Sequence, residues 1–347
     1  MKIADREISL AQPPYIIAEL SANHNGSLER AMDIVRAAKQ AGASAVKLQT
    51  YRPDTITLDS DRPEFMIHGG LWNDKRLFDL DQWAHMPWDW HKPLFVLAKE
   101  LGITIFSSPF DFTAIDLLAE LDAPAYKIAS FEAIDLPLIR YAAETQKPLI
   151  ISTGMANEAE IDAALNTAHK YGCGDVALLH CISGYPAPAE EYNLRTIPHM
   201  RQLFGCEIGL SDHTIGNTTA ITATAIGASL IEKHFTLSRA DGGPDSAFSL
   251  EPAELTQLVN DSKTAWASLG TVNYTPTPAE KQNMQFRRSL YLVKAVKNGD
   301  ILTKEHIRSV RPGLGLAPAE FDKIVGKKVT QDQPENVPLN WEWIETL

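Results

Sequence analysis

Residues 207–235 read EIGLSDHTIGNTTAITATAIGASLIEKHF and contain one complete unit of the fold. A first apolar run ends in Asp212 and His213, and a second ends in Glu232 and His234. The segment between them is rich in Ala and Thr and has the length of a helix. Two short β-type runs around a helical segment predict two parallel strands joined by a crossover helix.

The same alternation runs from the N-terminus to about residue 270. Each short apolar run is followed by a plausible helix, such as residues 28–40 or 158–171. The predicted strands are residues 15–20, 45–50, 103–108, 125–130, 148–153, 176–181, 207–212 and 229–235. An eightfold repeat favours a closed (β/α)8 TIM barrel over an open sheet.

Each predicted strand begins with apolar residues and ends in polar ones. These ends carry Glu19, Lys47, Gln49, Ser107, Ser108, Lys127, Ser130, Ser152, Thr153, His180, Asp212, His213, Glu232, Lys233 and His234. In a barrel all of them converge on one face, where barrel enzymes keep their active sites. Polar residues also mark strands that run out into loops, which explains one strand well but eight together poorly.

His213 and His234 end the seventh and eighth predicted strands, which are neighbours in a barrel. Two imidazoles could share one divalent ion and leave most of its coordination sphere to water or substrate. The alternative is a pair of hydrogen-bonded structural histidines. Flanking Ser211, Asp212 and Lys233 favour the metal site.

Lys47 and Lys127 lie among apolar neighbours, in AVKLQ and AYKIAS. A lysine that points into a barrel is costly unless it meets an anion. Hydroxyl groups near the strand ends would add neutral donors to a phosphate and a carboxylate; they belong to Ser107, Ser108, Ser130, Ser152 and Ser211. The alternatives are an ion pair with Glu19 or Glu132 for the lysines and strand-end capping for the hydroxyls.

The chain is expected to divide into a barrel over residues 1–270, a linker over 271–285 and a small domain over 286–347. Residues 51–91 are too many for an ordinary barrel loop and are rich in Trp, Pro and Gly, which indicates a lid or a recognition insert. The Pro- and Thr-rich TVNYTPTP at 271–278 is typical of a linker. The last segment predicts short strands and turns, with helical character only around 304–307 and 317–325.

Composition excludes several function classes. The 347 residues carry 32 Lys and Arg against 44 Asp and Glu, a net charge of -12 without long runs of one sign, so binding to nucleic acid or anionic membrane is not expected. No apolar stretch approaches the roughly 18 to 20 residues of a membrane span. Cys173, Cys181 and Cys206 are too few and irregular for a disulfide framework or a cysteine zinc site. These features predict a cytoplasmic protein.

Eight motifs together resemble the sialic acid synthases, and the resemblance covers almost the whole chain. They are IAELSANHNG (17–26), VKLQTY (46–51), SSPFD (107–111), YKIASFE (126–132), ISTGMA (151–156), HCISGYP (180–186), GLSDHT (209–214) and EKHFTL (232–237). The family opening more often reads IAEIG.NHNG, so Leu20 and Ser21 depart from it at a position that we assign no role.

The resemblance implies a condensation of phosphoenolpyruvate with the aldehyde of an open-chain amino sugar. His213 and His234 would hold a divalent metal, manganese by the family's preference, with cobalt or magnesium as alternatives. Glu19 would orient substrate or water and move a proton. Substrate would be bound by Lys47, Gln49, Ser108, Lys127, Ser130, Glu132, Ser152, Tyr185, Ser211 and Asp245.

The C-terminal segment resembles the family's antifreeze-like (SAF, β-clip) domain, through RRSLY (287–291), NGDILT (298–303) and RPGLG (311–315). In the family this domain crosses to the partner subunit and places an arginine in its active site. The resemblance implies a domain-swapped homodimer in which Arg311 has this catalytic role. From the residues alone, an RPG sequence is more typical of a plain surface turn.

Within the family, GGLW (69–72) and MPWDWH (86–91) look most like the pseudaminic acid synthase branch, although Met86 and Asp89 replace the usual Thr and Glu. Their tryptophans could anchor a long loop, or pack against the methyl and acetamido groups of a deoxygenated sugar. The expected substrate is 2,4-diacetamido-2,4,6-trideoxy-β-L-altropyranose. The alternatives are N-acetylneuraminate or legionaminate synthesis by the same chemistry and, more remotely, a metal-dependent barrel aldolase or a non-catalytic binding protein.

Overall fold

The computed structural model describes residues 1–345, so the last two residues of the predicted small domain lie outside it. The chain divides into two compact units, Met1–Gly270 and Thr271–Leu347, and each is described by itself. None of the helices in the described part combines the length and the apolar character that crossing a membrane requires.

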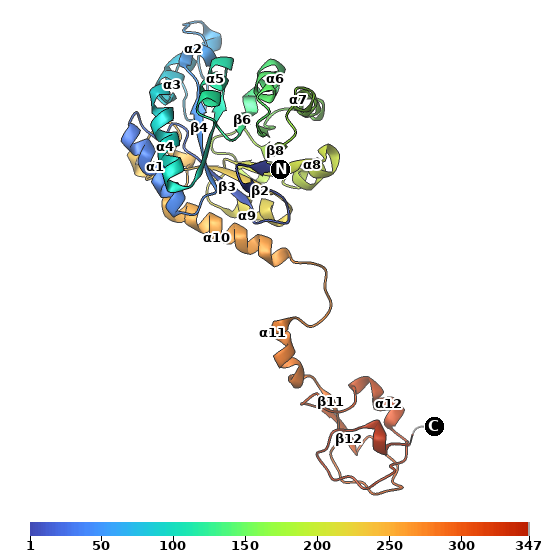
Figure 1. Ribbon diagram of the computed structural model, residues 1–347. Coiled ribbons are helices and arrows are strands. Elements are labelled where there is room, and N and C mark those ends of the chain that lie inside the picture. The colour runs from blue at the N-terminus through green and yellow to red at the C-terminus, as the bar shows by residue number, and fades with distance from the viewer. Residues whose placement is uncertain (346–347) are drawn as a thin grey trace. The chain divides into compact units, whose positions relative to one another are not determined.

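The first unit is a closed barrel of parallel strands, which confirms the predicted fold class (Figure 1). The strands are β3 (Tyr15–Glu19), β4 (Ala45–Thr50), β5 (Thr104–Pro109), β6 (Tyr126–Ile128), β7 (Leu149–Ser152), β8 (Val176–Cys181), β9 (Glu207–Asp212) and β10 (Leu230–His234). Chain neighbours pair throughout, and β10 closes the barrel on β3 with His234 opposite Glu19. The strand β6 is shorter than predicted because Ser130–Glu132 turns into a 3-10 helix, η3.

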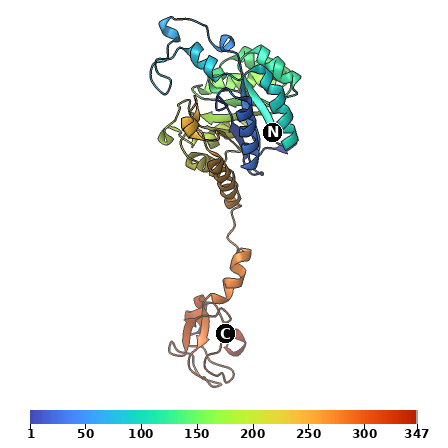
Figure 2. The same cartoon turned by 90° about the vertical axis from the view of Figure 1, so that its left-hand side faces the viewer.

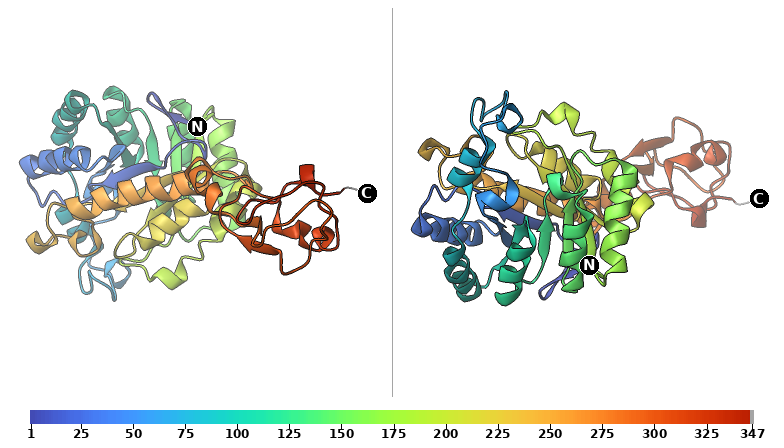
Figure 3. Two further views of the ribbon diagram at one scale, coloured as in Figure 1. Left: turned by 90° about the horizontal axis from the view of Figure 1, so that it is seen from below. Right: turned by 90° about the horizontal axis from the view of Figure 1, so that it is seen from above.

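A ring of helices surrounds the barrel strands in Figure 1, and Figure 3 shows the same helices from two other sides. The ring consists of α1 (Leu28–Gln40), α4 (His91–Leu101), α5 (Phe112–Glu120), α6 (Leu136–Glu144), α7 (Glu158–Lys170), α8 (Thr196–Phe204), α9 (Thr218–Ala225) and α10 (Pro252–Leu269). Local signals set where helices begin: Ser27 caps α1, and Asn157 forms a capping box with Glu160 at α7. The apolar stripes of the helices pack on the outward side chains of the strands.

A second apolar cluster fills the lower half of the barrel interior. It includes Tyr15, Ile17, Ala45, Phe106, Ala125, Ile150, Ala177, Leu179 and Leu230. The N-terminal hairpin of β1 (Lys2–Ile3) and β2 (Arg6–Glu7) closes this end, with Ile3 and Ile8 inserted into the cluster. Because side chains alternate along a strand, the next inward positions above this cluster include Glu19, Lys47 and Lys127.

The segment between β4 and α4 leaves the barrel at the end where its strands finish, and it appears in light blue in Figure 2. It contains α2 (Pro53–Ile56), η1 (Pro63–Phe65), α3 (Leu77–Ala84) and η2 (Trp88–Trp90). Three further 3-10 turns follow later strands of the barrel: η4 (Ala189–Glu191), η5 (Arg239–Asp241) and η6 (Ser246–Phe248).

The second unit contains a two-stranded antiparallel sheet, β11 (Ser289–Leu292) with β12 (Ile307–Val310). Its other elements are α11 (Pro278–Lys281), η7 (Gln282–Phe286), η8 (Pro318–Glu320), α12 (Phe321–Ile324) and η9 (Trp341–Trp343). Its own apolar core includes Leu290, Leu302 and Trp343. Two expectations differ from the structure: residues 278–285 of the expected linker lie in α11 and η7, and residues 304–306 form a turn that leads into β12.

Candidate active site

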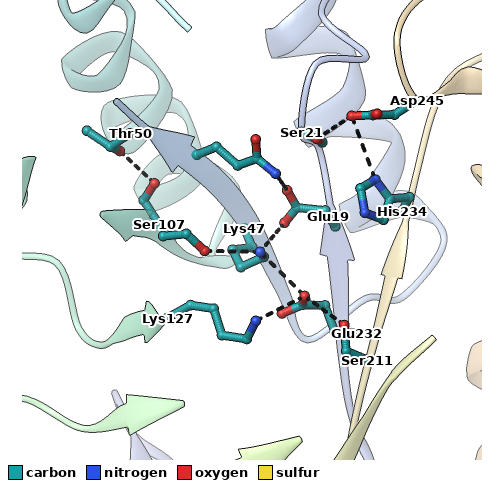
Figure 4. A network of polar contacts seen from close by, with 12 residues as sticks. Glu19, Ser21, Lys47, Thr50, Ser107, Lys127, Ser211, Glu232, His234 and Asp245 are labelled. Carbon is teal, nitrogen blue, oxygen red and sulfur yellow. Dashed lines mark hydrogen bonds and ion pairs between the residues drawn. The ribbon is translucent and has the colours of Figure 1, made fainter. Parts of the chain in front are cut away.

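A network of buried charges occupies the barrel mouth. Lys47 Nζ lies 2.9 Å from Glu19 Oε2 and 3.4 Å from Glu232 Oε1, and it donates a hydrogen bond of 3.1 Å to Ser108 Oγ. Lys127 Nζ lies 3.4 Å from the same Glu232 oxygen. Figure 4 shows Lys47 between the two carboxylates. Two lysines thus face two carboxylates in a site from which water is largely excluded.

Neutral groups extend this network on both sides. Gln49 Nε2 donates to Glu19 Oε1 at 3.1 Å, and Ser211 Oγ donates to Glu232 Oε1 at 3.4 Å. Glu232 was named among the strand ends but not among the expected substrate-binding residues. Its inward position two residues before His234 is the sequence signal that could have identified it.

Lys47 forms an ion pair with Glu19, one of the two partners named in the alternative interpretation of the lysines. Glu132 makes no described ion pair, and one of its oxygens is buried without a hydrogen-bond partner. An ion pair and an anion-binding role are compatible, because a carboxylate that neutralises a buried lysine keeps its charge tolerable until a ligand arrives.

Burial and pairing set the protonation of these groups. Burial raises the pKa of Glu19 to about 7, against the opposing charge of Lys47. For Lys47 burial acts to lower the pKa, but Glu19 and Glu232 outweigh it and the net shift is upward. The pKa of Lys127 is lowered by burial, because Glu232 compensates only in part. Lys47 is therefore held as a cation, whereas Glu19 can gain or lose a proton near neutral pH.

His213 and His234 lie beside this network with ring centroids 5.4 Å apart. His213 Nδ1 lies 2.8 Å from the carbonyl oxygen of Ile182, which fixes the proton there and leaves Nε2 as a free acceptor. His234 Nδ1 is buried without a hydrogen-bond partner. Burial lowers the pKa of His213 to about 4 and that of His234 well below its ordinary value, so both imidazoles are neutral.

This pair fits a divalent cation, because neutral imidazole is the ligating form of histidine and one ring nitrogen has no protein partner. Across residues 1–345 no group of three or more His, Cys, Asp and Glu side chains is arranged to hold a metal. Two protein ligands leave positions open for water or substrate, as a catalytic metal requires.

Asp245 and Tyr185 lie next to the histidines. Asp245 Oδ2 accepts hydrogen bonds from the hydroxyl of Ser21 and from the backbone N–H of Ala22, and it lies 4.0 Å from His234 Nδ1. Burial raises the pKa of Asp245. Tyr185 packs its ring 4.4 Å from that of His213. Ser21, to which we assigned no role, therefore holds an expected sugar-binding carboxylate in place.

The predicted phosphate-binding hydroxyls fall into two groups. Ser152 Oγ is buried without a partner, and Ser130 Oγ lies 2.8 Å from Ser183 Oγ. Ser107 was expected to bind substrate, but it faces away from the site. Its hydroxyl lies 2.6 Å from that of Thr50, because Ser107 and Ser108 point to opposite faces of β5. Only Ser108 of this pair reaches Lys47.

A second buried ion pair lies behind the histidines. Lys233 Nζ lies 2.8 Å from Asp212 Oδ2 and donates to the carbonyl oxygen of Thr214 at 2.6 Å, and both charged side chains are 0% exposed. Asp212 also accepts a hydrogen bond from the backbone N–H of Thr214 at 2.8 Å. The pair ties the loop that carries His213 to the strand that carries His234.

Arg311 directly follows β12 in the second unit, where it is exposed. All other expected site residues belong to the barrel unit, at the ends of its strands or in the loops that follow them.

The fold is a (β/α)8 barrel, and buried lysines, carboxylates and histidines gather at its mouth. The NeuB family model matches residues 34–274, and the SAF domain model matches 287–345. The chain belongs to the NeuB family. It is 44% identical to the pseudaminic acid synthase of Helicobacter pylori over 97% of this chain and 99% of that protein.

Two further relatives extend the comparison. The N,N'-diacetyllegionaminic acid synthase of Legionella pneumophila is 35% identical over 95% of this chain and 94% of its own length. A crystal structure of N-acetylneuraminic acid synthetase from Leptospira borgpetersenii in complex with citrate superposes with a TM-score of 0.73. It is 29% identical, and the match covers 83% of this chain and 95% of that one.

The buried Lys233 and Asp212 pair leads to a stability prediction. Lys233→Met should lower the free energy of unfolding by about 3 to 5 kcal/mol, because it leaves the Asp212 carboxylate buried without its cation. Adding Asp212→Asn should recover part of this loss. Lys147→Met is the matched control, since Lys147 pairs with Asp122 at 2.7 Å on the surface and should cost at most about 1 kcal/mol. Equal losses in urea unfolding of the two single variants would contradict the prediction.

Glu132 leads to a prediction about pH. Burial raises its pKa from 4.5 to about 7, so between these values the carboxyl group ionises in the unfolded chain but stays protonated in the folded one. The free energy of unfolding therefore falls as pH rises through this range. Glu132→Gln should stabilise the protein at pH 8 by up to about 3 kcal/mol, and hardly at pH 4.

The check is denaturant unfolding of both proteins at the two pH values. The same substitution at the exposed Glu120 should give the same small difference at pH 4 and pH 8. A Glu132→Gln effect that does not change with pH would show that this carboxyl group titrates normally.

Proposed function

We propose that this chain is a pseudaminic acid synthase, a cytoplasmic transferase of the NeuB family. It would condense phosphoenolpyruvate, 2,4-diacetamido-2,4,6-trideoxy-β-L-altropyranose and water to a nine-carbon nonulosonic acid and phosphate. The observation that carries the proposal is the 44% identity to the Helicobacter pylori enzyme over nearly the whole of both chains. Legionaminate synthesis is the second candidate, because that relative is also similar over 94% of its length, at 35% identity.

Phosphoenolpyruvate carries a carboxylate and a phosphate, and the mouth supplies donors for both. Lys47 and Lys127 provide charge, and the hydroxyls of Ser130, Ser152 and Ser211 provide neutral donors. The unpartnered hydroxyl of Ser152 supports this role, since a buried donor without a partner gains a full hydrogen bond when ligand binds. Phosphate oxygens would replace Glu232 as the partner of Lys127.

His213 and His234 would hold a divalent cation, with manganese as the proposed ion. Such a cation lowers the barrier to attack on an aldehyde by withdrawing electron density from its oxygen. The protein holds the neutral histidines in place through the Ile182 carbonyl group and the Lys233 and Asp212 pair. Asp245 and Tyr185, beside the same rings, would orient the sugar.

The reaction forms one carbon–carbon bond, and at the former enol carbon it replaces the bond to the phosphate oxygen with a bond to the oxygen of water. The methylene carbon of phosphoenolpyruvate attacks the aldehyde carbon, and the aldehyde oxygen takes up a proton to become a hydroxyl group. Water adds to the former enol carbon and releases one proton. The hydroxyl group left on that carbon then passes its proton to the phosphate as it becomes the keto group, and phosphate leaves with its bridging oxygen. Glu19, with its pKa near 7, would transfer these protons, and Gln49 fixes its orientation.

The test is release of phosphate from phosphoenolpyruvate with a panel of amino sugars and manganese. The 2,4-diacetamido-altrose sugar should exceed N-acetylmannosamine by at least about tenfold in kcat/KM, because its acetamido groups satisfy polar partners that the other sugar leaves unpaired. Chelator should abolish turnover and manganese restore it, and His213→Ala or His234→Ala should remain inactive in manganese.

Each alternative gives its own result. Equal efficiency on both sugars would assign the chain to another branch of the family. Carbon–carbon bond formation without phosphate release would indicate an aldolase. Full activity of either histidine variant in chelator would exclude the metal site.

We further propose a domain-swapped homodimer in which Arg311 of one subunit binds substrate in the barrel of the other. The exposed position of Arg311 leaves its guanidinium available for this, and a guanidinium binds a carboxylate in a two-pronged way that lysine cannot reproduce. An exchange with twofold symmetry repeats the same contact twice and closes the assembly.

Mixing inactive subunits tests this arrangement. Arg311→Ala and Lys127→Ala chains, refolded together, should regain about a quarter of wild-type sites, since half the dimers are mixed and each has one intact site. Arg308→Ala, which removes an exposed arginine from β12, should keep wild-type activity alone. A mixture that stays inactive although mixed dimers form would show that Arg311 acts within its own chain or not at all.

A further inference from the structure

The long segment between β4 and α4 is fixed at its C-terminal end by buried contacts. His91 Nε2 lies 2.7 Å from Thr50 Oγ1, at the last residue of β4. Trp90 presents its ring to that of His24 edge-on, with centroids 5.5 Å apart. Trp90 therefore anchors the C-terminal end of this segment.

Trp72 lies in the middle of the same segment and makes different contacts. Residues 66–76 form a narrow antiparallel turn, closed by a bridge between Met66 and Arg76. From this turn Trp72 Nε1 donates to the carbonyl oxygen of Pro244 at 3.1 Å, and its ring lies 5.8 Å from that of Tyr185. The indole thus connects the segment after β4 with the loops after β8 and β10.

Both contacts of the indole belong to the candidate site. Tyr185 packs at 4.4 Å from the His213 ring, and Pro244 directly precedes Asp245. Phe248 completes this aromatic side of the mouth, 5.4 Å from Tyr185 and 4.8 Å from the ring of His234. The indole therefore lies one aromatic ring beyond the histidines.

Trp72, Tyr185 and Phe248 form an aromatic wall. The chemistry of the indole limits which groups of a sugar can bind favourably against this wall. The only polar group of the indole is its N–H, which the Pro244 oxygen already engages. What remains is an apolar face, against which a hydroxyl group would lose its water without gaining a hydrogen bond. A methyl group has no such loss and gains dispersion contacts.

We infer that Trp72 is a specificity-determining residue, and that its indole, with Tyr185 and Phe248, selects amino sugars that end in a methyl group instead of a hydroxymethyl group. The inference rests on the proposed function, because it concerns the end of the sugar remote from the aldehyde that His213 and His234 would serve. It assigns Trp72 a role that differs from the anchoring role of Trp90.

The experiment compares two sugars that differ only at the terminal carbon, the 6-deoxy diacetamido-altrose and its 6-hydroxy counterpart, with saturating phosphoenolpyruvate. The wild-type enzyme should prefer the 6-deoxy sugar by about 10- to 100-fold in kcat/KM, the range for one hydroxyl group in an apolar pocket. Trp72→Ala should bring this ratio below about 3 by losing activity on the 6-deoxy sugar. Trp72→Gln, with polar groups at the wall, should lower the ratio at least as far.

Two further variants test whether the change in sugar preference comes from the apolar ring at position 72 and not from a general disturbance of the segment. Trp72→Phe removes the N–H but keeps an apolar ring, so the ratio should stay above about 10 while kcat/KM falls for both sugars. Trp83→Ala removes an exposed tryptophan from α3 of the same segment and should leave the ratio at its wild-type value. The KM for phosphoenolpyruvate should be unchanged in every variant, which verifies an intact barrel.

The possible results are distinguishable. A wild-type ratio kept by both Trp72→Ala and Trp72→Gln would overturn the inference and leave the proposed function standing, as would a wild-type enzyme that uses both sugars equally. No phosphate release with either sugar would remove the proposed function itself. If Trp72→Ala does not fold, the ratios of Trp72→Gln and Trp72→Phe decide the question by the same measurement.

Discussion

The barrel mouth depends on the pairing of two buried lysines with two buried carboxylates. Lys47 would be too costly to bury alone, and Glu19 and Glu232 within 3.4 Å make its charge tolerable. The positive charge of Lys127 is compensated less than that of Lys47, because among the described residues Lys127 forms an ion pair with Glu232 alone. An anion that enters this mouth meets cations already desolvated and oriented, so little reorganisation is needed when it binds.

The strands could be predicted to within a few residues because a parallel barrel buries both faces of its strands and gives continuous apolar runs. Of the polar residues at the ends of these runs, Glu19, Lys47 and Lys127 lie at the mouth as expected, whereas Asp212 and Lys233 form their own ion pair behind the histidines. Because side chains alternate along β5, Ser108 points into the barrel and contacts Lys47, whereas Ser107 points out of the barrel and contacts Thr50. Counting inward positions in twos from the lower apolar cluster would have made this distinction from sequence.

Other features of the site could not be predicted, because they depend on contacts between loops far apart in the chain. Ser21 bonds a carboxylate 224 residues away, and Trp72 donates to a carbonyl group 172 residues away. Neither local pattern nor spacing encodes such contacts, which arise only when the barrel brings its loops together. The resemblance of GGLW to one branch of the family drew attention to Trp72, but only the structure separates it from the anchoring Trp90.

The hairpin of β1 and β2 affects where a molecule can enter and leave the barrel. Ile3 and Ile8 seal the lower end of the barrel, and a layer of apolar side chains lies between them and the charged groups. Among the described residues, these side chains close that end of the barrel to a molecule bound at the charged groups. Such a molecule would therefore enter and leave at the mouth, so that a product has to depart before the next substrate can bind.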